Sequence, residues 1–219
     1  MKVELVTNVL DANTAIAEQN RQFFAAKGVF VLNLMSAPGA GKTTILEKTI
    51  EALKDQIRIG VIEGDICTTR DAERIAALGI PAVQINTDGA CHLDANMILR
   101  SLQNLSLEDL DLLVIENVGN LVCPAEFDLG EHYKAMVISV TEGNDKPTKY
   151  PLMFKESQAI LVNKLDLLPY TDFSLEVLKQ DLETLNPQAQ VFPISARTGE
   201  GVGAWSQWLV ELASSIKSK

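Results

Sequence analysis

Short apolar runs alternate with amphipathic stretches along most of the chain. Several of these runs are continuously apolar and do not alternate between apolar and polar positions, as expected for strands buried on both faces. The pattern predicts strands over Val29–Met35, Ile57–Ile62, Ala82–Ile85, Leu112–Ile115, Met136–Val140, Ala159–Val162 and Val191–Ile194.

Helical spacing of apolar residues fills the intervals between these runs. It predicts helices near 43–55, 69–78, 93–104, 174–185 and 202–216. A further helix is expected over 8–27, where Val9, Ala12, Ile16, Phe23 and Phe24 fall near one face and Gly28 ends it. Alternation of this kind predicts an α/β fold with a mostly parallel central sheet flanked by helices. Ligands of such sheets bind at the carboxyl ends of the strands, so the functional residues are expected in the loops that follow strands.

The composition is that of an ordinary globular domain. With 219 residues, 47% of them hydrophobic and 22% charged, and without a repeat or a Pro/Gly-rich linker, the chain is expected to form a single P-loop domain over 1–219. The segment 1–28 is expected to pack on that domain as an N-terminal helix. A net charge of −10 repels phosphate backbones, so nucleic acid is not an expected partner.

The expected compartment is the cytoplasm. The N-terminus carries acidic residues where a secretory signal would be apolar, and no run reaches the roughly 18 apolar residues of a membrane span. Neither secretion nor membrane association is therefore expected. Three cysteines, an odd number, do not form a disulfide framework, so their thiols are expected to be free for chemistry or for a metal.

A phosphate-binding loop follows the first predicted strand. The run Ser36-Ala37-Pro38-Gly39-Ala40-Gly41-Lys42-Thr43-Thr44 has the Walker A pattern between a strand and a helix, with Ser36 where the pattern usually has glycine. Backbone N–H groups and the helix N-terminus would face the phosphates, Lys42 would reach the β- and γ-phosphates, and Thr43 would bind Mg²⁺. The residues predicted to bind nucleotide here are Pro38, Gly39, Ala40, Gly41, Lys42, Thr43 and Thr44.

A guanine-reading motif follows the strand predicted over Ala159–Val162. In Asn163-Lys164-Leu165-Asp166, the Asp166 carboxylate can accept two hydrogen bonds that guanine offers and adenine does not. Asn163 would brace the loop and the stem of Lys164 would cover the base. Ser195 and Ala196 form an S-A element expected to contact the guanine oxygen. The predicted nucleotide is therefore GTP, or GDP after hydrolysis.

Acidic residues end two further strands, in Glu63-Gly64-Asp65 and Glu116-Asn117-Val118-Gly119. Asp65 and Glu116 are predicted to hold Mg²⁺ with Thr43 and, together with Lys42, to form the catalytic set. Ras-like GTPases have aspartate at the position of Glu116. The sequence shows no evident glutamine to orient water and no placed arginine finger, so slow GTP hydrolysis, gated by a partner or by dimerisation, is expected.

Two cysteines and a histidine occupy loops after strands. Cys91-His92 follows one strand and Cys123 lies in the loop after another, so two thiolates and an imidazole could bind Ni²⁺ or Zn²⁺. Three ligands leave a tetrahedral site incomplete, which water or a second subunit could complete. The alternative is that these cysteines are simply small buried residues. Cys67 is interpreted as structural, or at most as a support outside the ligand set.

Together these stretches resemble the HypB family, GTPases that help insert nickel into [NiFe]-hydrogenases. The resemblance lies in SAPGAGKTT, EGDICTTRDAERI, GACHLDA, ENVGNLVCPAEFDLGE, TEGNDKPTKYP, NKLDLLPY and PISARTGEGV. It implies a GTP-promoted homodimer with Cys91, His92 and Cys123 at its interface, and nickel or zinc as the metal. It also implies a HypA-type nickel carrier and the hydrogenase large subunit as partners, and a contact of Lys146 with nucleotide across the dimer. Some relatives begin with a cysteine-rich nickel motif or a histidine-rich tract; neither stands in this sequence, so nickel storage is not expected.

Three other functions compete with this one. The urease-accessory GTPases are similar but typically carry a Cys-Pro-His motif, whereas here His92 follows Cys91 directly and Cys123 precedes Pro124-Ala125. A GTP-gated regulatory scaffold with structural zinc is a second alternative. A metabolic kinase is a third, which the Asn163–Asp166 motif and the lack of an identifiable acceptor site argue against.

Overall fold

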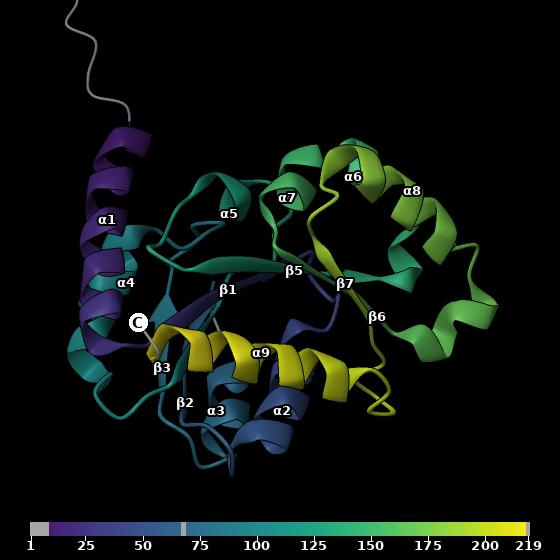
Figure 1. Ribbon diagram of the computed structural model, residues 1–219. Helices are drawn as coiled ribbons and strands as arrows, with labels where there is room; N and C mark the ends of the chain where they lie inside the picture. The colour runs from purple at the N-terminus through teal and green to yellow at the C-terminus, as the bar shows by residue number, and fades with distance from the viewer. Residues whose placement is uncertain (1–8, 67–68, 218–219) are drawn as a thin grey trace, which may run out of the picture.

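The computed structural model describes residues 9–66 and 69–217, which form a seven-stranded sheet with helices on both faces (Figure 1). The strand order is β3-β2-β4-β1-β5-β6-β7, and every neighbouring pair is parallel. The strands are β1 (Phe30–Ser36), β2 (Ile59–Asp65), β3 (Ala82–Asn86), β4 (Leu112–Glu116), β5 (Tyr133–Ser139), β6 (Ala159–Asn163) and β7 (Gln190–Pro193). The predicted α/β class and all the predicted strands are confirmed, with ends displaced by a few residues.

The predicted helices are present as α1 (Val9–Lys27), α2 (Lys42–Leu53), α3 (Arg70–Ala76), α4 (Ala95–Ser101), α8 (Leu175–Leu185) and α9 (Val202–Lys217). Helix α4 begins later than predicted because Asp94 caps it, accepting a hydrogen bond from the Met97 N–H. The apolar pattern did not predict α5 (Cys123–Glu126), α6 (Lys146–Lys149) and α7 (Pro151–Glu156), nor the 3₁₀ turns η1 (Leu102–Asn104), η2 (Val140–Glu142) and η3 (Leu165–Tyr170). Elements this short show too little periodicity to be recognised.

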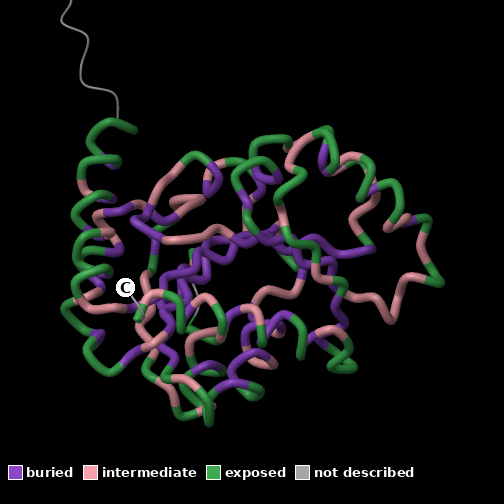
Figure 2. The backbone as a smooth tube through the Cα atoms, in the orientation of Figure 1, coloured by how far each residue is buried: buried purple, intermediate pink, exposed green. Residues whose placement is uncertain are grey.

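Each face of the sheet has its own helical layer (Figures 1 and 2). One face packs against α2, α3 and α9, where Trp205 is buried and its indole N–H donates to the Thr49 hydroxyl at 3.0 Å. The other face is covered by α1 and α4 at the β3 side and by α7 and α8 at the β7 side. Within the described residues, no helix combines the length and apolar character needed to cross a membrane.

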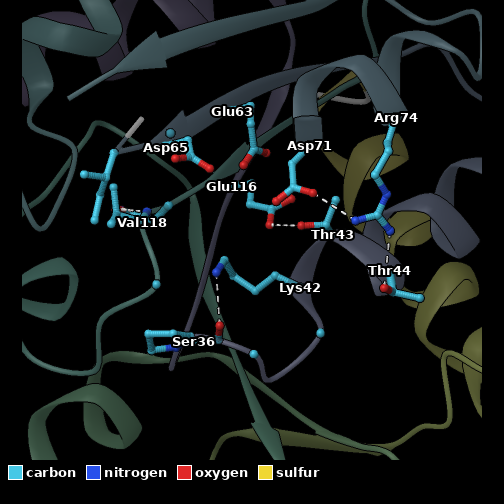
Figure 3. Close-up of a pocket in the computed structure, with 17 residues that line it drawn as sticks. Ser36, Lys42, Thr43, Thr44, Glu63, Asp65, Asp71, Arg74, Glu116 and Val118 are labelled. Carbon is cyan, nitrogen blue, oxygen red and sulfur yellow. Dashed lines mark hydrogen bonds and ion pairs between the residues drawn. The ribbon is translucent and has the colours of Figure 1, made fainter. Parts of the chain in front are cut away.

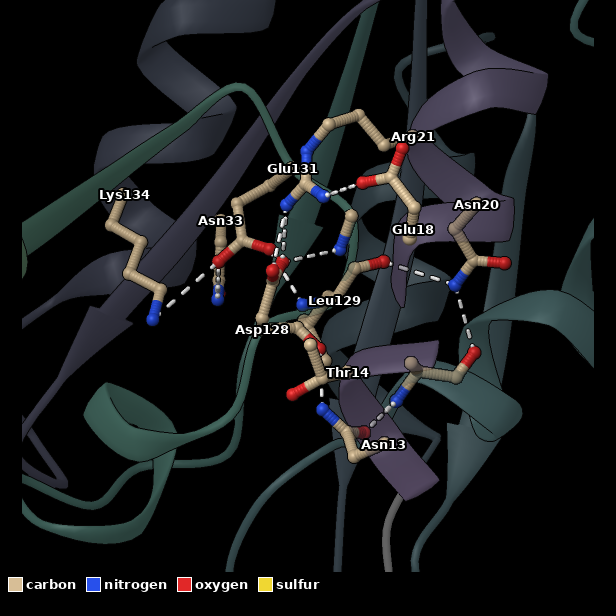
Figure 4. Close-up of polar contacts among 12 residues, drawn as sticks. Asn13, Thr14, Glu18, Asn20, Arg21, Asn33, Asp128, Leu129, Glu131 and Lys134 are labelled. Carbon is tan, nitrogen blue, oxygen red and sulfur yellow. Dashed lines mark hydrogen bonds and ion pairs between the residues drawn. The ribbon is translucent and has the colours of Figure 1, made fainter. Parts of the chain in front are cut away.

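Helix α1 is attached through polar side chains, some of them buried (Figure 4). The Asn20 amide donates to the carbonyl oxygens of Ala95 and Leu129, at 2.9 and 3.0 Å, and Arg21 makes two hydrogen bonds with Asp128. The face that was predicted from apolar residues is therefore partly wrong. Ala12 and Phe23 are exposed, whereas Phe24 is buried, and Asn13 and Asn20 take two further buried positions and bind backbone carbonyls there.

Candidate nucleotide and metal site

The phosphate-binding loop joins β1 to α2 and forms one wall of a cavity of about 380 Å³ (Figure 3). Ser36, where glycine was expected, is buried at the end of β1, and its hydroxyl accepts a 3.1 Å hydrogen bond from the Lys42 ammonium. The cavity is lined by Pro38, Gly39, Gly41, Lys42, Thr43 and Thr44 of the loop and helix, and by Asp65 and Glu116 opposite. The side chains predicted to hold phosphate and Mg²⁺ therefore face one space.

A pair of buried carboxyl groups stands beside Thr43. Glu63 and Glu116 are register partners on the adjacent strands β2 and β4, and they are 3% and 2% exposed. The Thr43 hydroxyl donates to the Glu116 Oε1 at 2.7 Å. Burial, reinforced by the charge of Glu116, raises the pKa of Glu63 to about 11, and burial also raises the pKa of Glu116. Two carboxylates this close do not both ionise readily, so the pair favours holding a proton.

This carboxyl pair fits a hard cation. Among the described residues, the Oε2 atoms of both Glu63 and Glu116 are buried and lack a hydrogen-bond partner. Mg²⁺ prefers oxygen ligands, and a positive charge here would offset the cost of ionising the pair. Glu63 is a candidate that the sequence reading passed over in favour of Asp65. Only the register of β2 with β4 places Glu63 beside Glu116, and that register cannot be derived from the sequence.

The guanine-reading motif lies next to the phosphate-binding loop. The Asn163 amide donates to the Ala40 carbonyl at 2.8 Å, and a Cβ added to Gly41 would lie 2.4 Å from the Asn163 Nδ2, so only glycine fits there. The Lys164 ammonium donates to the Gly39 carbonyl at 2.8 Å. Asn163 thus fixes the motif against the loop that would hold the phosphates.

The S-A element, Ser195-Ala196, is hydrogen-bonded to the guanine-reading motif. The Asn163 Oδ1 accepts from the Ala196 N–H at 3.1 Å, and the Ser195 hydroxyl donates to the Asp166 Oδ1 at 2.6 Å. Asn163, Lys164, Asp166 and Ala196 line a second cavity of about 210 Å³, which Gly41 and Thr44 line as well. Because those two residues border both cavities, the two cavities are adjacent, and a base in one and phosphates in the other would belong to one nucleotide.

Lys146 stands apart from both cavities in this single chain. It begins α6, and its ammonium lies 5.5 Å from the centroid of the Tyr150 ring. It is not among the residues that line either cavity.

The cysteines and the histidine come together. The ligand atoms of Cys91, His92 and Cys123 all lie within 4.8 Å of one another, with the two sulfur atoms 3.0 Å apart. The His92 ring packs on the Phe127 ring with centroids 3.8 Å apart, which restricts its orientation. Burial lowers the pKa of His92, which favours the neutral imidazole that binds a metal. Cys67 lies outside the described residues.

The donor set fits a soft or borderline cation. Two thiols and one imidazole suit Zn²⁺ or Ni²⁺, and three ligands leave a coordination position open. The hydrogen bond from Cys91, followed by burial, raises the pKa of the Cys123 thiol. A bound cation would displace that shared proton, as metal binding at thiols requires.

Comparisons with known proteins show the family to which the chain belongs. The family described as CobW/HypB/UreG, nucleotide-binding domain, matches residues 30–193. The hydrogenase maturation factor HypB of Escherichia coli is 52% identical over 207 residues, which covers 94% of this chain and 71% of that protein.

Solved structures are similar over most of their length. The crystal structure of HypB from Helicobacter pylori in complex with nickel has a TM-score of 0.89 and 38% identity, covering 93% of this chain and 96% of that one. HypB from Archaeoglobus fulgidus has a TM-score of 0.87 and 40% identity, covering 93% of this chain and 100% of that one. On these grounds the chain belongs to the HypB family of hydrogenase maturation factors, within the CobW/HypB/UreG nucleotide-binding proteins.

Proposed function

We propose that this chain is a GTP-hydrolysing metallochaperone that helps deliver nickel to the large subunit of [NiFe]-hydrogenase. The observation that carries the proposal is the cluster of Cys91, His92 and Cys123, whose ligand atoms lie within 4.8 Å of one another in a nucleotide-binding fold. The nickel-bound HypB of Helicobacter pylori, a relative with the same fold, supports nickel as the cargo.

The nucleotide chemistry follows from the site. Asp166 would accept the guanine N1–H and amine, while Lys42 and the N–H groups that follow Gly39 would hold the phosphates. Thr43, Asp65 and Glu116 would hold Mg²⁺, which when bound supplies charge stabilisation to the phosphoryl group. Glu63 would stabilise the same site by sharing the charge of the buried pair.

Hydrolysis in this chain is proposed to be slow. The Arg74 guanidinium borders the cavity, but it is held by Glu47 and Asp71 at 2.6 and 2.9 Å. Bound in this way, it is not available to stabilise charge on a transferring phosphoryl group. Gating by dimerisation or by a partner therefore fits the site better than autonomous turnover.

The proposed assembly is a GTP-promoted homodimer. The open coordination position at the Cys/His cluster suits a second subunit or a transfer partner, and Lys146, which borders neither cavity of its own chain, is proposed to reach nucleotide across the dimer. A HypA-type nickel carrier and the hydrogenase large subunit are the proposed partners. We further propose a single domain over 1–219 and a cytoplasmic location, with Zn²⁺ as an alternative occupant of the cluster.

Nickel transfer tests the proposal directly. The protein loaded with ⁶³Ni²⁺ is mixed with the metal-free large-subunit precursor, and nickel in the precursor is counted after separation, with GTP, GDP or a non-hydrolysable GTP analogue. The expected result is transfer that GTP accelerates and the analogue does not. Nickel that stays on the chain under all three conditions would instead support a regulatory scaffold with a structural metal.

A related client deserves the same assay. The relative from Helicobacter hepaticus, 43% identical over 204 residues, is a hydrogenase/urease maturation factor HypB. Metal-free urease in place of the hydrogenase precursor distinguishes the two clients, since transfer to urease alone would favour the urease-accessory function.

A further inference from the structure

Neighbouring residues at the end of β4 point to opposite faces of the sheet. Side chains alternate along a strand, and here Leu112 and Val114 join the core under α2 and α9, while Leu113 and Ile115 join the core under α1 and α4. Glu116 continues the first set and meets Thr43 of α2. Asn117, just past the strand, continues the second set and turns away from the phosphate-binding loop.

Asn117 is fixed by four hydrogen bonds. Its Oδ1 accepts from the Leu93 N–H at 3.1 Å and from the Val118 N–H at 2.9 Å, and its Nδ2 donates to the Asn33 Oδ1 at 3.2 Å. Its own N–H donates to the Leu34 carbonyl at 2.9 Å. Asn117 is 1% exposed, so each of these bonds is protected from competing water.

Leu93 follows Cys91 and His92 directly and is fully buried. Its N–H is held by Asn117, and its side chain covers Gly64 of β2, where an added Cβ would lie 2.7 Å from the Leu93 Cδ1. Gly64 and Asn117 both border the nucleotide cavity, each next to a carboxylate of the Mg²⁺ set. The loop that carries two metal ligands therefore rests on the ends of two strands that face the nucleotide.

The third ligand depends on the same strand end. Residues 117–122 connect Glu116 to Cys123 through the main chain, which gives a shift of the β4 end a covalent path to Cys123. The Asn117 side chain adds a separate link from that strand end to the Cys91–His92 loop. Both parts of the metal cluster are thus attached to one point of the nucleotide site.

We propose that Asn117 is the positioning residue that transmits the nucleotide state of the Glu116 end of β4 to the Cys91–His92 loop, and so sets the metal affinity of the cluster. This rests on the proposed function, because it requires both GTP and metal to bind. The link is reciprocal: whatever the nucleotide does to metal affinity, the metal does to nucleotide affinity by the same factor.

The test compares nickel affinity in two nucleotide states. Ni²⁺ alone is titrated into the full chain saturated with GDP or with a non-hydrolysable GTP analogue, and the ratio of the two dissociation constants is the coupling. The wild-type ratio is expected to differ from one by at least about 5-fold, the lower end of measured couplings between sites. In Asn117→Ala the ratio is expected to fall to within about 2-fold of one, with one nickel still bound per cluster.

Two variants separate coupling from simple loss of structure. Asn33→Ala removes an equally buried amide and the acceptor of the Asn117 Nδ2, but leaves the Leu93–Asn117 bond, so it should keep the coupling (Figure 4 shows Asn33 bound to Glu131 on its other side). Asn117→Asp keeps an oxygen acceptor for the Leu93 N–H, although it loses the donor to Asn33. This variant should keep most of the wild-type ratio that Asn117→Ala loses. Thermal unfolding confirms that the alanine variants are folded at the assay temperature.

Three outcomes would overturn the inference. The first is a wild-type ratio of nickel dissociation constants near one. The second is an unchanged ratio in Asn117→Ala. The third is a loss of coupling in Asn33→Ala as large as that in Asn117→Ala. None of these outcomes contradicts the proposed function. That function would be contradicted if the wild-type chain bound no nickel at the cluster or bound no GTP.

Discussion

The Thr43 hydroxyl donates a 2.7 Å hydrogen bond to the Glu116 carboxylate, joining the start of α2 to the end of β4. Both groups are proposed Mg²⁺ ligands, and they approach from a helix and a strand that are far apart in sequence. Their contact shows that the fold brings the two halves of the proposed magnesium site together through protein groups alone.

Replacing Glu116 with glutamine should slow GTP hydrolysis by about 100-fold, the scale of losing one electrostatic group that acts in the transition state. GTP binding should change much less, because the phosphate-binding loop and Asp166 are intact. Single-turnover hydrolysis across a Mg²⁺ titration measures both. Glu51→Gln on the exposed side of α2 is the control, since Glu51 pairs there with Lys48, away from the cavity. Equal rates in the Glu116→Gln variant and the control would remove Glu116 from the catalytic set.

Asp166→Asn should weaken GTP binding by about 100-fold or more and allow xanthosine triphosphate to bind instead. The physical reason is that an amide presents a donor where guanine also has one, whereas xanthine presents an acceptor. Asparagine can still accept the Ser195 hydroxyl hydrogen bond, so the loop should keep its shape. Competition binding with both nucleotides is the measurement, with the exposed Asp172→Asn as its matched control. Unchanged preference for GTP would refute the role of Asp166.

Cys91→Ala should abolish metal binding at the cluster while leaving GTP binding intact. Two remaining ligands, His92 and Cys123, do not hold Zn²⁺ or Ni²⁺ firmly at a site that already lacks a fourth. Metal stoichiometry after dialysis, set beside nucleotide affinity, checks this. Cys67→Ala provides a thiol control and should keep the metal. Retention of metal by Cys91→Ala would mean that the ligand set is different.

Asp111→Asn should destabilise the fold in a pH-dependent way. Burial alone would raise the pKa of Asp111, but the hydrogen bonds from Arg58 and Lys217 outweigh it and hold the pKa below its usual range. Its stabilising contribution is therefore present above the unfolded-state pKa of roughly 3.9 and is lost as the pH falls below that value. Because solvent screens the pair, the expected loss of unfolding free energy is about 1 kcal/mol at pH 7.

Urea unfolding at pH 7 and near pH 3 measures this difference, which should shrink at the lower pH. Asp109→Asn is the comparison, since Asp109 is 82% exposed and 3.8 Å from the same arginine. A destabilisation that is the same at both pH values would point to lost packing and not to charge.

The sequence predicted most of the architecture, because buried parallel strands leave continuous apolar runs and the loops after them carry fixed motifs. Lys42 and Thr43 could be named because strand, glycine-rich loop and helix occur in order, and Glu116 because it ends a continuous apolar run. The elements missed, such as α5 and α6, are only one helical turn long and open next to prolines, where no periodicity accumulates.

The remaining misses share one cause, which is that contacts between residues far apart in sequence have no sequence signature. Glu63 joins the candidate site only because β2 aligns it with Glu116, and the link proposed for Asn117 depends on its hydrogen bond from the Leu93 N–H. Asn20 takes a buried position on α1 in the same way, because its amide N–H groups donate to the carbonyls of Ala95 and Leu129.

The opposite directions of Glu116 and Asn117 constrain how this segment can change in length. Inserting or deleting one residue in β4 would shift its side chains by one position and turn each to the wrong face. A carboxylate would then face the Cys91–His92 loop and an amide the phosphate-binding loop. A change of two residues would keep the alternation, so length variants that retain both sites should differ by an even number of residues.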